Sequence, residues 1–430
     1  MKIVAASDAG ELAGLYASGW DPPAEVKNGV TAILADVRAR GDAALLEYTR
    51  RFDYPDASLA GLRIEIPTLE EARRLVPAEI AEGLTVARDR VAAFHAMQRA
   101  HDLELRDADG TLSALLVRPF GAVGAYVPGG SASLPSSLIM TVVPAKIAGV
   151  ERIAVMTPPG RDGTIGAAIR FAASLCGVDE LYAAGGAQAI AALAFGTKHV
   201  AKVDKIVGPG NVWVTEAKRQ LFGVCGIDGL AGPSEVLVVA DDSARAELVA
   251  GEMIAQAEHD PLARVAAVSW DRGLLERVAT LLEGPFATAC GRAEIVSAVL
   301  ANNAYLIHAR GRDEVLEVID RFAPEHLSLQ MRDPWSLVPE IRRAGAIFIG
   351  DDTPVAAGDY LAGSNHVLPT SGAARFSSGL RTADFYRTIA LVANSPARMR
   401  GDAHTLAALA EFEGLPAHAR TAVLRMKDEG

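Results

Sequence analysis

The chain has 430 residues, and its composition is that of a folded globular protein. Hydrophobic residues make up 50% of the sequence and charged residues 22%, which excludes intrinsic disorder for most of the chain. The 42 Lys and Arg residues are outnumbered by 53 Asp and Glu residues, so the net charge is −11. Because nonspecific nucleic-acid binding depends on neutralising phosphates, we expect no nucleic-acid partner. At about 100–200 residues per domain, this length indicates about two to four domains.

The sequence predicts neither a secreted nor a membrane protein. Its first ten residues hold one lysine and no long apolar core, unlike a secretory signal. The most apolar stretch, 138–150, is shorter than the roughly 18 residues that a membrane span needs. The three cysteines lie far apart and form no CxxC pair, so neither disulfides nor a thiolate zinc site is indicated. We therefore expect a cytoplasmic protein without a membrane partner.

The first hundred residues are predicted to be helical. Apolar residues between 30 and 37 recur at the spacing of one helix face. The segment 68–71 (TLEE) has the pattern of a capping box at the start of another helix. A hairpin is then expected over 103–117, with its turn at Asp109-Gly110.

After the hairpin, short apolar runs alternate with helical patterns. The runs lie at 153–156, 181–183, 205–207, 236–239 and 265–268. Strands and helices that alternate at this spacing predict βαβ units and a largely parallel sheet. From Ser395 the sequence becomes helical again, with Pro396 at the first helical position and Gly414 as a stop.

A glutamine and a histidine three residues apart form the first candidate site. Gln256 and His259 follow a helical pattern and share one helix face. Zinc accepts nitrogen and oxygen ligands, so both side chains could bind one metal ion. The alternative is a helix end at which His259 interacts with the helix dipole. Spacing alone leaves both interpretations open.

The adjacent pair Glu325-His326 is the second candidate. It follows Pro324, which favours an extended conformation in the residue before it. Histidine titrates near neutral pH, which suits a general base. The alternative is a solvated loop without chemistry.

Two further segments bring carboxylates and histidines together. The glycine-rich loop 358–369 carries Asp359, a candidate metal ligand, and His366, a candidate ligand or hydrogen-bonding support. Glu413 and His418 flank a predicted helix break. The alternatives are a loop of Asx turns for the first segment and a helix cap with an exposed histidine for the second.

Glycine-rich turns at 121–130, 185–188 and 208–211 each follow an apolar run, and the last two precede helices. The first backbone amides of a helix can bind a phosphate group. None of these turns matches GxGxxG with an acidic residue about 20 positions later, so spacing alone does not establish a dinucleotide site. Tight turns between strands and helices are the alternative.

Eight blocks of sequence together resemble the histidinol dehydrogenase family, the zinc- and NAD-dependent enzymes that complete histidine biosynthesis. The blocks are YVPGGSASLPSSLIM (126–140), GGAQAIAALAFGT (185–197), VDKIVGPGNVWVTEAKR (203–219), AGPSEVLVVAD (231–241), AQAEHDPLA (255–263), FAPEHLSL (322–329), GDYLAGSNHVLPT (358–370) and EGLPAH (413–418). The resemblance runs from about Val26 to about Arg425. The segment 381–388 (RTADFYRT) departs from the apolar run usual in the family, which affects the expected packing at the start of the tail.

The resemblance implies an α/β fold of two Rossmann-like parallel-sheet domains, with a helical N-terminal arm and a helical C-terminal tail exchanged in a homodimer. We expect the arm at 1–25 and the tail at 376–430. The larger domain, 26–118 plus 233–375, would carry the zinc and substrate site. The smaller domain, 119–232, would lie on the NAD side.

The resemblance also assigns roles to the candidate residues. The implied zinc ligands are Gln256, His259, Asp359 and His418 of the partner subunit. The implied substrate-contacting residues are these four together with Ser234, His326 and Glu413. The implied dinucleotide-contacting residues are Tyr126, Gln188 and Asn211.

The implied reaction oxidises L-histidinol to L-histidine through L-histidinal, and it consumes two NAD because an alcohol becomes a carboxylate. His326 would be the general base, and Glu325 would activate the water that hydrates the aldehyde. The alternatives are a paralogue that oxidises another polar alcohol, a zinc hydrolase that uses Glu325 as its base, and a non-catalytic binding protein. Glu413 and His418 together favour histidinol as the substrate, and a hydrolase would not explain the glycine-rich turns.

Overall fold

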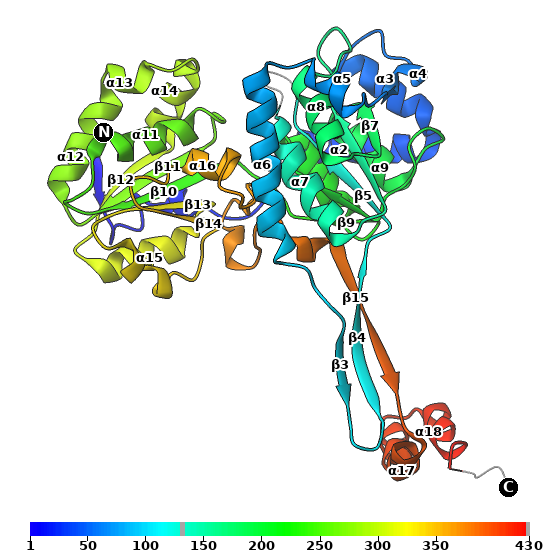
Figure 1. The fold of residues 1–430 in the computed structure, drawn as a ribbon. Helices are drawn as coiled ribbons and strands as arrows, with labels where there is room; N and C mark the ends of the chain where they lie inside the picture. The colour runs from blue at the N-terminus through cyan, green and yellow to red at the C-terminus, as the bar shows by residue number, and fades with distance from the viewer. Residues whose placement is uncertain (130–133, 427–430) are drawn as a thin grey trace. The chain divides into compact units, whose positions relative to one another are not determined.

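The computed structural model describes residues 1–129 and 134–426, and the chain divides into two compact units. The first unit comprises Met1–Gln98 and Gly121–Asp384, and the second comprises Arg99–Phe120 and Phe385–Gly430. The first unit contains two six-stranded sheets with helices packed on them (Figure 1). It therefore has the expected α/β fold with parallel sheets.

The first sheet is parallel throughout, with the strand order β1-β12-β11-β10-β13-β14. Its strand β10 (Glu235–Ala240) is apolar after its first residue because both faces of the sheet are covered. Val236 and Val238 pack in one buried cluster, and Leu237 and Val239 pack in another on the opposite face.

The other strands of this sheet are β1 (Ile3–Ala5), β11 (Arg264–Ser269), β12 (Ala304–His308), β13 (His326–Gln330) and β14 (Ala346–Ile349). The helices of the same domain are α1 (Ala13–Tyr16), α11 (Ala246–Ala257), α12 (Arg272–Glu283), α13 (Pro285–Thr288), α14 (Ala293–Asn302), α15 (Arg312–Phe322) and α16 (Val355–Tyr360).

The second sheet has the order β2-β7-β6-β5-β8-β9, and only the edge strand β2 is antiparallel to its neighbour. Its strands are β2 (Arg63–Ile64), β5 (Ala122–Tyr126), β6 (Arg152–Thr157), β7 (Glu180–Ala183), β8 (Lys205–Val207) and β9 (Gly226–Ile227). Its helices are α2 (Ala24–Arg40), α3 (Asp42–Phe52), α4 (Leu59–Leu62), α5 (Leu69–Arg73), α6 (Ala78–Ala96), α7 (Pro135–Ala148), α8 (Ala167–Cys176), α9 (Gly186–Phe195) and α10 (Val212–Leu221). The predicted capping box at Thr68 is present.

Two expected boundaries differ from the structure. Residues 1–25 do not form a helical arm, because Ile3–Ala5 pairs in parallel with β12 and Val4 is buried in the core of the first sheet. Residues 26–98 belong with the second sheet rather than with 233–375, because β2 joins its edge and the apolar face of α2 packs in its core. The amphipathic pattern identified the helix but did not identify the sheet on which it packs.

The second unit contains a three-stranded antiparallel sheet in the order β15-β4-β3, followed by two helices. The elements are β3 (Leu103–Arg106), β4 (Leu112–Pro119), β15 (Tyr386–Ala393), α17 (Pro396–Phe412) and α18 (Pro416–Val423). The hairpin prediction is confirmed, and Ser395 caps α17 as expected. The expectation of a purely helical tail over 376–430 is wrong, because all eight residues of β15 pair with β4.

The atypical segment 381–388 is anchored by two buried residues where it leads into this sheet, although Arg381, Ala383, Arg387 and Thr388 are exposed. Thr382 and Phe385 are fully buried. The Thr382 hydroxyl donates to the carbonyl oxygen of His95 at 2.9 Å, and its N–H donates to Gln98 Oε1 at 3.0 Å. Hydrogen bonds thus hold this segment, whose packing could not be predicted from the sequence. Among the described residues, no helix is both long and apolar enough to span a bilayer.

Candidate active site

One cavity of about 470 Å³ in the first unit brings together seven of the predicted site residues. They are Asn211, Ser234, Gln256, His259, Glu325, His326 and Asp359. Ser234 and Glu325 directly precede β10 and β13, which are hydrogen-bonded neighbours. Helix α11 follows β10 and returns toward the start of that strand, so Gln256 at its end reaches the same edge. The cavity therefore lies at the amino edge of the first sheet.

The candidate metal ligands come from two helix ends. Gln256 is buried in the last turn of α11, and the N–H of His259, which is exposed, donates to the Gln256 carbonyl at 3.3 Å. Asp359 lies in the short helix α16. Both oxygens of buried Glu252 accept the Val355 N–H, at 3.1 and 3.3 Å, and so fix the start of α16. Burial raises the pKa of Glu252, and the charge of Asp359 raises it further.

His366 is held against Asp359. Its Nδ1 lies 2.9 Å from the Asp359 carbonyl oxygen, and its Nε2 lies 3.3 Å from Ser137 Oγ. A carbonyl oxygen only accepts, so Nδ1 carries the proton and Nε2 accepts from Ser137. His366 therefore acts as a hydrogen-bonding support in this structure, which is one of the two roles that its loop predicted.

The backbone of Glu235 holds both members of the Glu325–His326 pair. Its N–H donates to Glu325 Oε2 at 2.9 Å. Its carbonyl oxygen lies 2.9 Å from His326 Nδ1, so Nδ1 is the protonated ring nitrogen. This tautomer leaves the lone pair of His326 Nε2 available, which is the arrangement a general base needs.

Burial shifts the protonation equilibria of both groups. It raises the pKa of Glu325 well above its usual value; nearby Glu235 and Asp359 add to this effect, and the N–H of Glu235 opposes it. Burial lowers the pKa of His326, against the attraction of Asp359. At neutral pH the imidazole is therefore neutral and able to accept a proton. Paired groups whose pKa values are displaced by burial are typical of catalytic sites.

The donor atoms fit zinc better than they fit a metal that prefers only oxygen. Gln256, His259 and Asp359 offer an amide oxygen, an imidazole nitrogen and a carboxylate, all of which zinc accepts. Within residues 1–129 and 134–426, no three His, Cys, Asp or Glu side chains gather to hold a metal ion by themselves. The proposed ligand set therefore includes the amide of Gln256, and a four-coordinate zinc ion would need one further ligand.

Two of the four remaining predicted residues, Glu413 and His418, belong to the second unit. Glu413 caps the end of α17, and His418 lies in the first turn of α18. Both are exposed. The expected helix break is confirmed by Gly414, whose φ of 75° lies in the left-handed region that favours glycine.

A second cavity of about 790 Å³ is lined by all three predicted dinucleotide-contacting residues, Tyr126, Gln188 and Asn211. Tyr126 ends β5, Gln188 lies in the first turn of α9, and Asn211 caps α10. These positions form the carboxyl edge of the second sheet, where its strand order reverses between β5 and β8. Nucleotides bind at such reversal points in open α/β sheets. Asn211 lines both cavities, which therefore adjoin.

Sequence reasoning missed Asp53, which also lines this second cavity. Its Oδ2 accepts the Gly185 N–H at 3.0 Å and the Gln188 amide at 3.3 Å, next to the start of α9. Burial raises its pKa, and these two donors oppose the shift. Asp53 follows a helix and sits in none of the eight sequence blocks, so no local pattern pointed to it.

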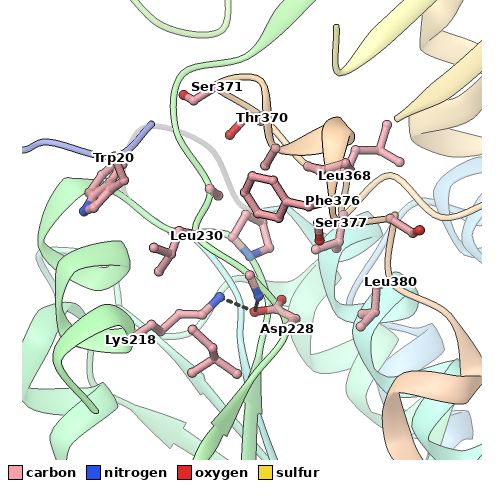
Figure 2. Close-up of a pocket in the computed structure, with 18 of the residues that line it drawn as sticks. Trp20, Lys218, Asp228, Leu230, Leu368, Thr370, Ser371, Phe376, Ser377 and Leu380 are labelled. Atoms are coloured by element: carbon pink, nitrogen blue, oxygen red, sulfur yellow. Dashed lines mark hydrogen bonds and ion pairs between the residues drawn. The ribbon is translucent and has the colours of Figure 1, made fainter. Parts of the chain in front are cut away.

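A third cavity of about 440 Å³ adjoins the first, because the two share Trp20, Pro209, Ala231, Val367, Leu368 and Thr370. Figure 2 shows this third cavity, with Trp20, Leu368 and Thr370 among the labelled residues. Lys218 and Asp228 form a buried ion pair on its wall, and Lys218 Nζ also donates to the Gly208 carbonyl at 3.0 Å. Because these charges are paired with each other, they support the turn at Gly208 and do not present a free charge to the cavity.

The fold and the site together define an α/β enzyme in which two parallel sheets contribute adjoining cavities, one of them lined by the buried side chains of Glu325 and His326. Comparison with known proteins identifies it further. A family model for histidinol dehydrogenase matches residues 21–426. Histidinol dehydrogenase of Gluconobacter oxydans (strain 621H) is 44% identical over 430 residues, which cover 99% of this chain and 100% of that protein. The enzyme of Geobacter sulfurreducens is 45% identical over 418 residues, 97% of each chain.

The crystal structure of histidinol dehydrogenase from Elizabethkingia anophelis has the same fold. Its TM-score is 0.89 at 33% identity, covering 97% of this chain and 95% of that one. The chain belongs to the histidinol dehydrogenase family. It is an oxidoreductase of histidine biosynthesis that oxidises histidinol.

Proposed function

We propose that the chain converts L-histidinol to L-histidine through L-histidinal, with two NAD each accepting one hydride and zinc holding the substrate. The observation that carries this proposal is the first cavity, where Gln256, His259 and Asp359 lie with the buried pair Glu325–His326. The second cavity supports the NAD assignment, since it adjoins the first and lies at the strand-order reversal.

Gln256, His259 and Asp359 would hold the metal through one oxygen, one nitrogen and one carboxylate ligand. When bound, zinc supplies a template that orients the substrate for oxidation. Ser234 lies at the same edge of the sheet, directly before β10, and would contact the substrate from there.

His326 would act as general base in both oxidation steps. In the first, Nε2 accepts the hydroxyl proton while a hydride leaves the carbinol carbon for NAD, and the C–O bond becomes C=O. Before the second oxidation, Nε2 passes its proton to water and is a base again. In that step Nε2 accepts a proton from the hydrated aldehyde while a second hydride leaves its carbon for a second NAD, and the acid forms. The hydrogen bond from Nδ1 to the Glu235 carbonyl supports this role because it keeps Nε2 unprotonated.

Glu325 would serve the hydration between the two oxidations. Water must add to the carbonyl carbon of the aldehyde, with one proton leaving the water and one reaching the carbonyl oxygen. A carboxyl group whose pKa is raised by burial exchanges protons closer to neutral pH than an ordinary glutamate does. That shift supports Glu325 as the group that takes the proton from the water.

We further propose that Glu413 and His418 of the partner subunit complete the site in a homodimer. The site residues of the first unit leave a four-coordinate metal one ligand short, and Glu413 and His418 are exposed in the second unit. Such an exchange explains why a carboxylate and a histidine are placed together on an exposed helix corner.

The direct test is NADH formation by purified protein with L-histidinol, NAD and zinc, with and without a chelator. We expect two NADH per histidinol, loss of activity on chelation and recovery with zinc. A folded, zinc-loaded protein that forms no NADH from histidinol, but does so from another polar alcohol, would contradict the assignment of histidinol and favour the paralogue.

A further inference from the structure

Glu235 is the first residue of β10, and its backbone bonds both proposed catalytic groups. Its N–H holds Glu325 at 2.9 Å, and its carbonyl oxygen holds His326 Nδ1 at 2.9 Å. Any displacement of this residue would therefore move the carboxyl group and the imidazole together. What fixes the position of Glu235 consequently matters for the reaction.

The side chain of Glu235 is fully buried and is fixed on one oxygen. Oε1 accepts from the Arg264 guanidinium and from the Ser371 N–H, the latter at 3.0 Å. Oε2 is buried without a hydrogen-bond partner among the described residues. A buried ion pair with an unpaired acceptor is costly and is weak evidence of a stabilising role. The arrangement instead suggests a functional constraint on this carboxylate.

Arg264 connects Glu235 to the N-terminal segment. One terminal nitrogen binds Glu235, and the other donates to the carbonyl oxygens of Gly14, at 3.4 Å, Leu15, at 3.0 Å, and Ala17. These carbonyls lie at the end of α1, where helix carbonyl groups lack partners within the helix and attract cations. The guanidinium also lies over the ring of buried Phe322, with its carbon 5.6 Å from the ring centroid.

Ser371 ties the same carboxylate to the loop that follows Asp359 and His366. Its φ of 54° is in the left-handed region, which a serine adopts at an energetic cost. Its N–H binds Glu235, and its carbonyl oxygen accepts the Gly19 N–H at 3.0 Å. Such strain persists only when surrounding bonds enforce it, and it concentrates at functional sites.

We propose that Glu235 and Arg264 are positioning residues of the oxidation, which hold the Glu325–His326 pair in register with the loop at Ser371 and with the end of α1. This inference rests on the proposed function. Glu235 and Arg264 line neither the first nor the second cavity, so they would act through the residues that they hold. The N-terminal segment would take part by binding Arg264. Arginine suits this position because two separate nitrogens of its planar guanidinium bind Glu235 and the carbonyls of the N-terminal segment, whereas a lysine would have to make all of these bonds from one nitrogen.

The test compares Glu235→Gln and Arg264→Lys with wild type, with histidinol and histidinal supplied separately. We expect kcat to fall about 10- to 100-fold on both substrates, because small displacements of catalytic groups cost rates of this order. KM for NAD and the zinc content should stay within about two-fold, since no contact of Glu235 or Arg264 reaches the dinucleotide cavity or a proposed zinc ligand. Arg264→Lys should retain more activity than Arg264→Met.

Glu216→Gln is the matched control. Glu216 is equally buried and paired with an arginine, Arg219, but it lies on α10 with no bond to either catalytic group. If the loss of a buried carboxylate lowers kcat only through stability, Glu216→Gln should lose activity as well. If Glu235 positions the catalytic groups, folded Glu216→Gln should keep the wild-type kcat. Thermal unfolding followed by circular dichroism reports the folded fraction of each variant.

Wild-type kcat in folded Glu235→Gln and Arg264→Lys would overturn the inference. A fall in kcat that only follows the folded fraction, as expected for Glu216→Gln, would also overturn it. So would a loss of zinc as large as the loss of kcat. If zinc-loaded wild type does not oxidise histidinol, the proposed function fails first. If wild type does so and the variants match it, only the positioning role fails.

Discussion

The two sheets of the first unit share one topology and use opposite edges. Apart from one extra edge strand each, the orders β12-β11-β10-β13-β14 and β7-β6-β5-β8-β9 are equivalent, with three consecutive strands on one side and two on the other. In the second sheet the lining of the cavity comes from the carboxyl edge, at Tyr126 and at the starts of α9 and α10. In the first sheet it comes from the amino edge, at Ser234 and Glu325.

With the proposed function, one topology supplies two kinds of chemistry. The carboxyl edge of a parallel sheet presents the starts of helices, with backbone N–H groups that suit nucleotides. The amino edge of the first sheet presents strand starts and a helix end instead. There, the backbone of Glu235 in β10 bonds the side chains of Glu325, directly before β13, and His326, its first residue. The comparison predicts that substitutions at the two edges have separable effects.

The largest effect is expected from His326→Ala at the amino edge. Loss of a general base should lower kcat about 10²–10⁴-fold in both half-reactions, with KM for NAD little changed. Because burial lowers the pKa of His326, the wild-type rate should fall only when the pH drops below the usual value for histidine, about 6.5, as the imidazole becomes protonated. Steady-state rates over a pH series measure both effects.

His95→Ala is the control for this variant, because His95 is buried outside the three cavities. It should lower stability without lowering the kcat of the folded fraction. Near-normal turnover of His326→Ala on both substrates would remove the assignment of the base.

Glu325→Gln should produce the next largest effect, and the effect should be asymmetric. The amide preserves the shape but cannot take a proton from water, so oxidation of histidinal should slow by about 10²-fold or more. Oxidation of histidinol should slow less. Stopped-flow NADH traces with each substrate measure the two steps. Equal losses would argue that Glu325 serves both oxidations and does not act mainly on the water.

At the carboxyl edge of the second sheet, Gln188→Ala should raise KM for NAD by about 10-fold and leave the zinc content unchanged. The change removes a donor to the buried Asp53 carboxylate, and an uncompensated polar group costs about 1–3 kcal/mol. Gln220→Ala, which removes an amide of α10 outside both cavities, is the control. A loss of zinc in Gln188→Ala would show that the two edges are not separable.

The smallest effect is expected from Tyr126→Phe. The phenol oxygen accepts the Gly186 N–H at 3.2 Å at the start of α9, and one such bond contributes about 0.5–1.5 kcal/mol. KM for NAD should therefore rise about 2- to 10-fold with kcat nearly unchanged. If kcat falls while KM for NAD stays constant, Tyr126 acts on the chemical step instead of on the dinucleotide.

Much of this account follows from the sequence, and the exceptions have physical causes. The alternation of apolar runs and helices predicted the parallel sheets, because strands buried on both faces must be continuously apolar. Seven of the eight blocks supply the predicted residues that gather in two cavities, and the eighth, 413–418, lies exposed in the second unit. Periodicity could not tell that α2 packs on the second sheet, since an apolar helix face does not specify its partner. Asp53 and the roles of Arg264 and Ser371 depend on contacts between segments distant in sequence.

The central claim is that the metal and the dinucleotide bind at opposite edges of two equivalent sheets. A crystal structure of the protein with zinc, L-histidinol and NAD tests it most directly. We predict zinc on Gln256, His259 and Asp359 at the amino edge of the first sheet, and NAD in the cavity of Tyr126, Gln188 and Asn211. Zinc bound elsewhere, or NAD at the carboxyl edge of the first sheet, would contradict the account.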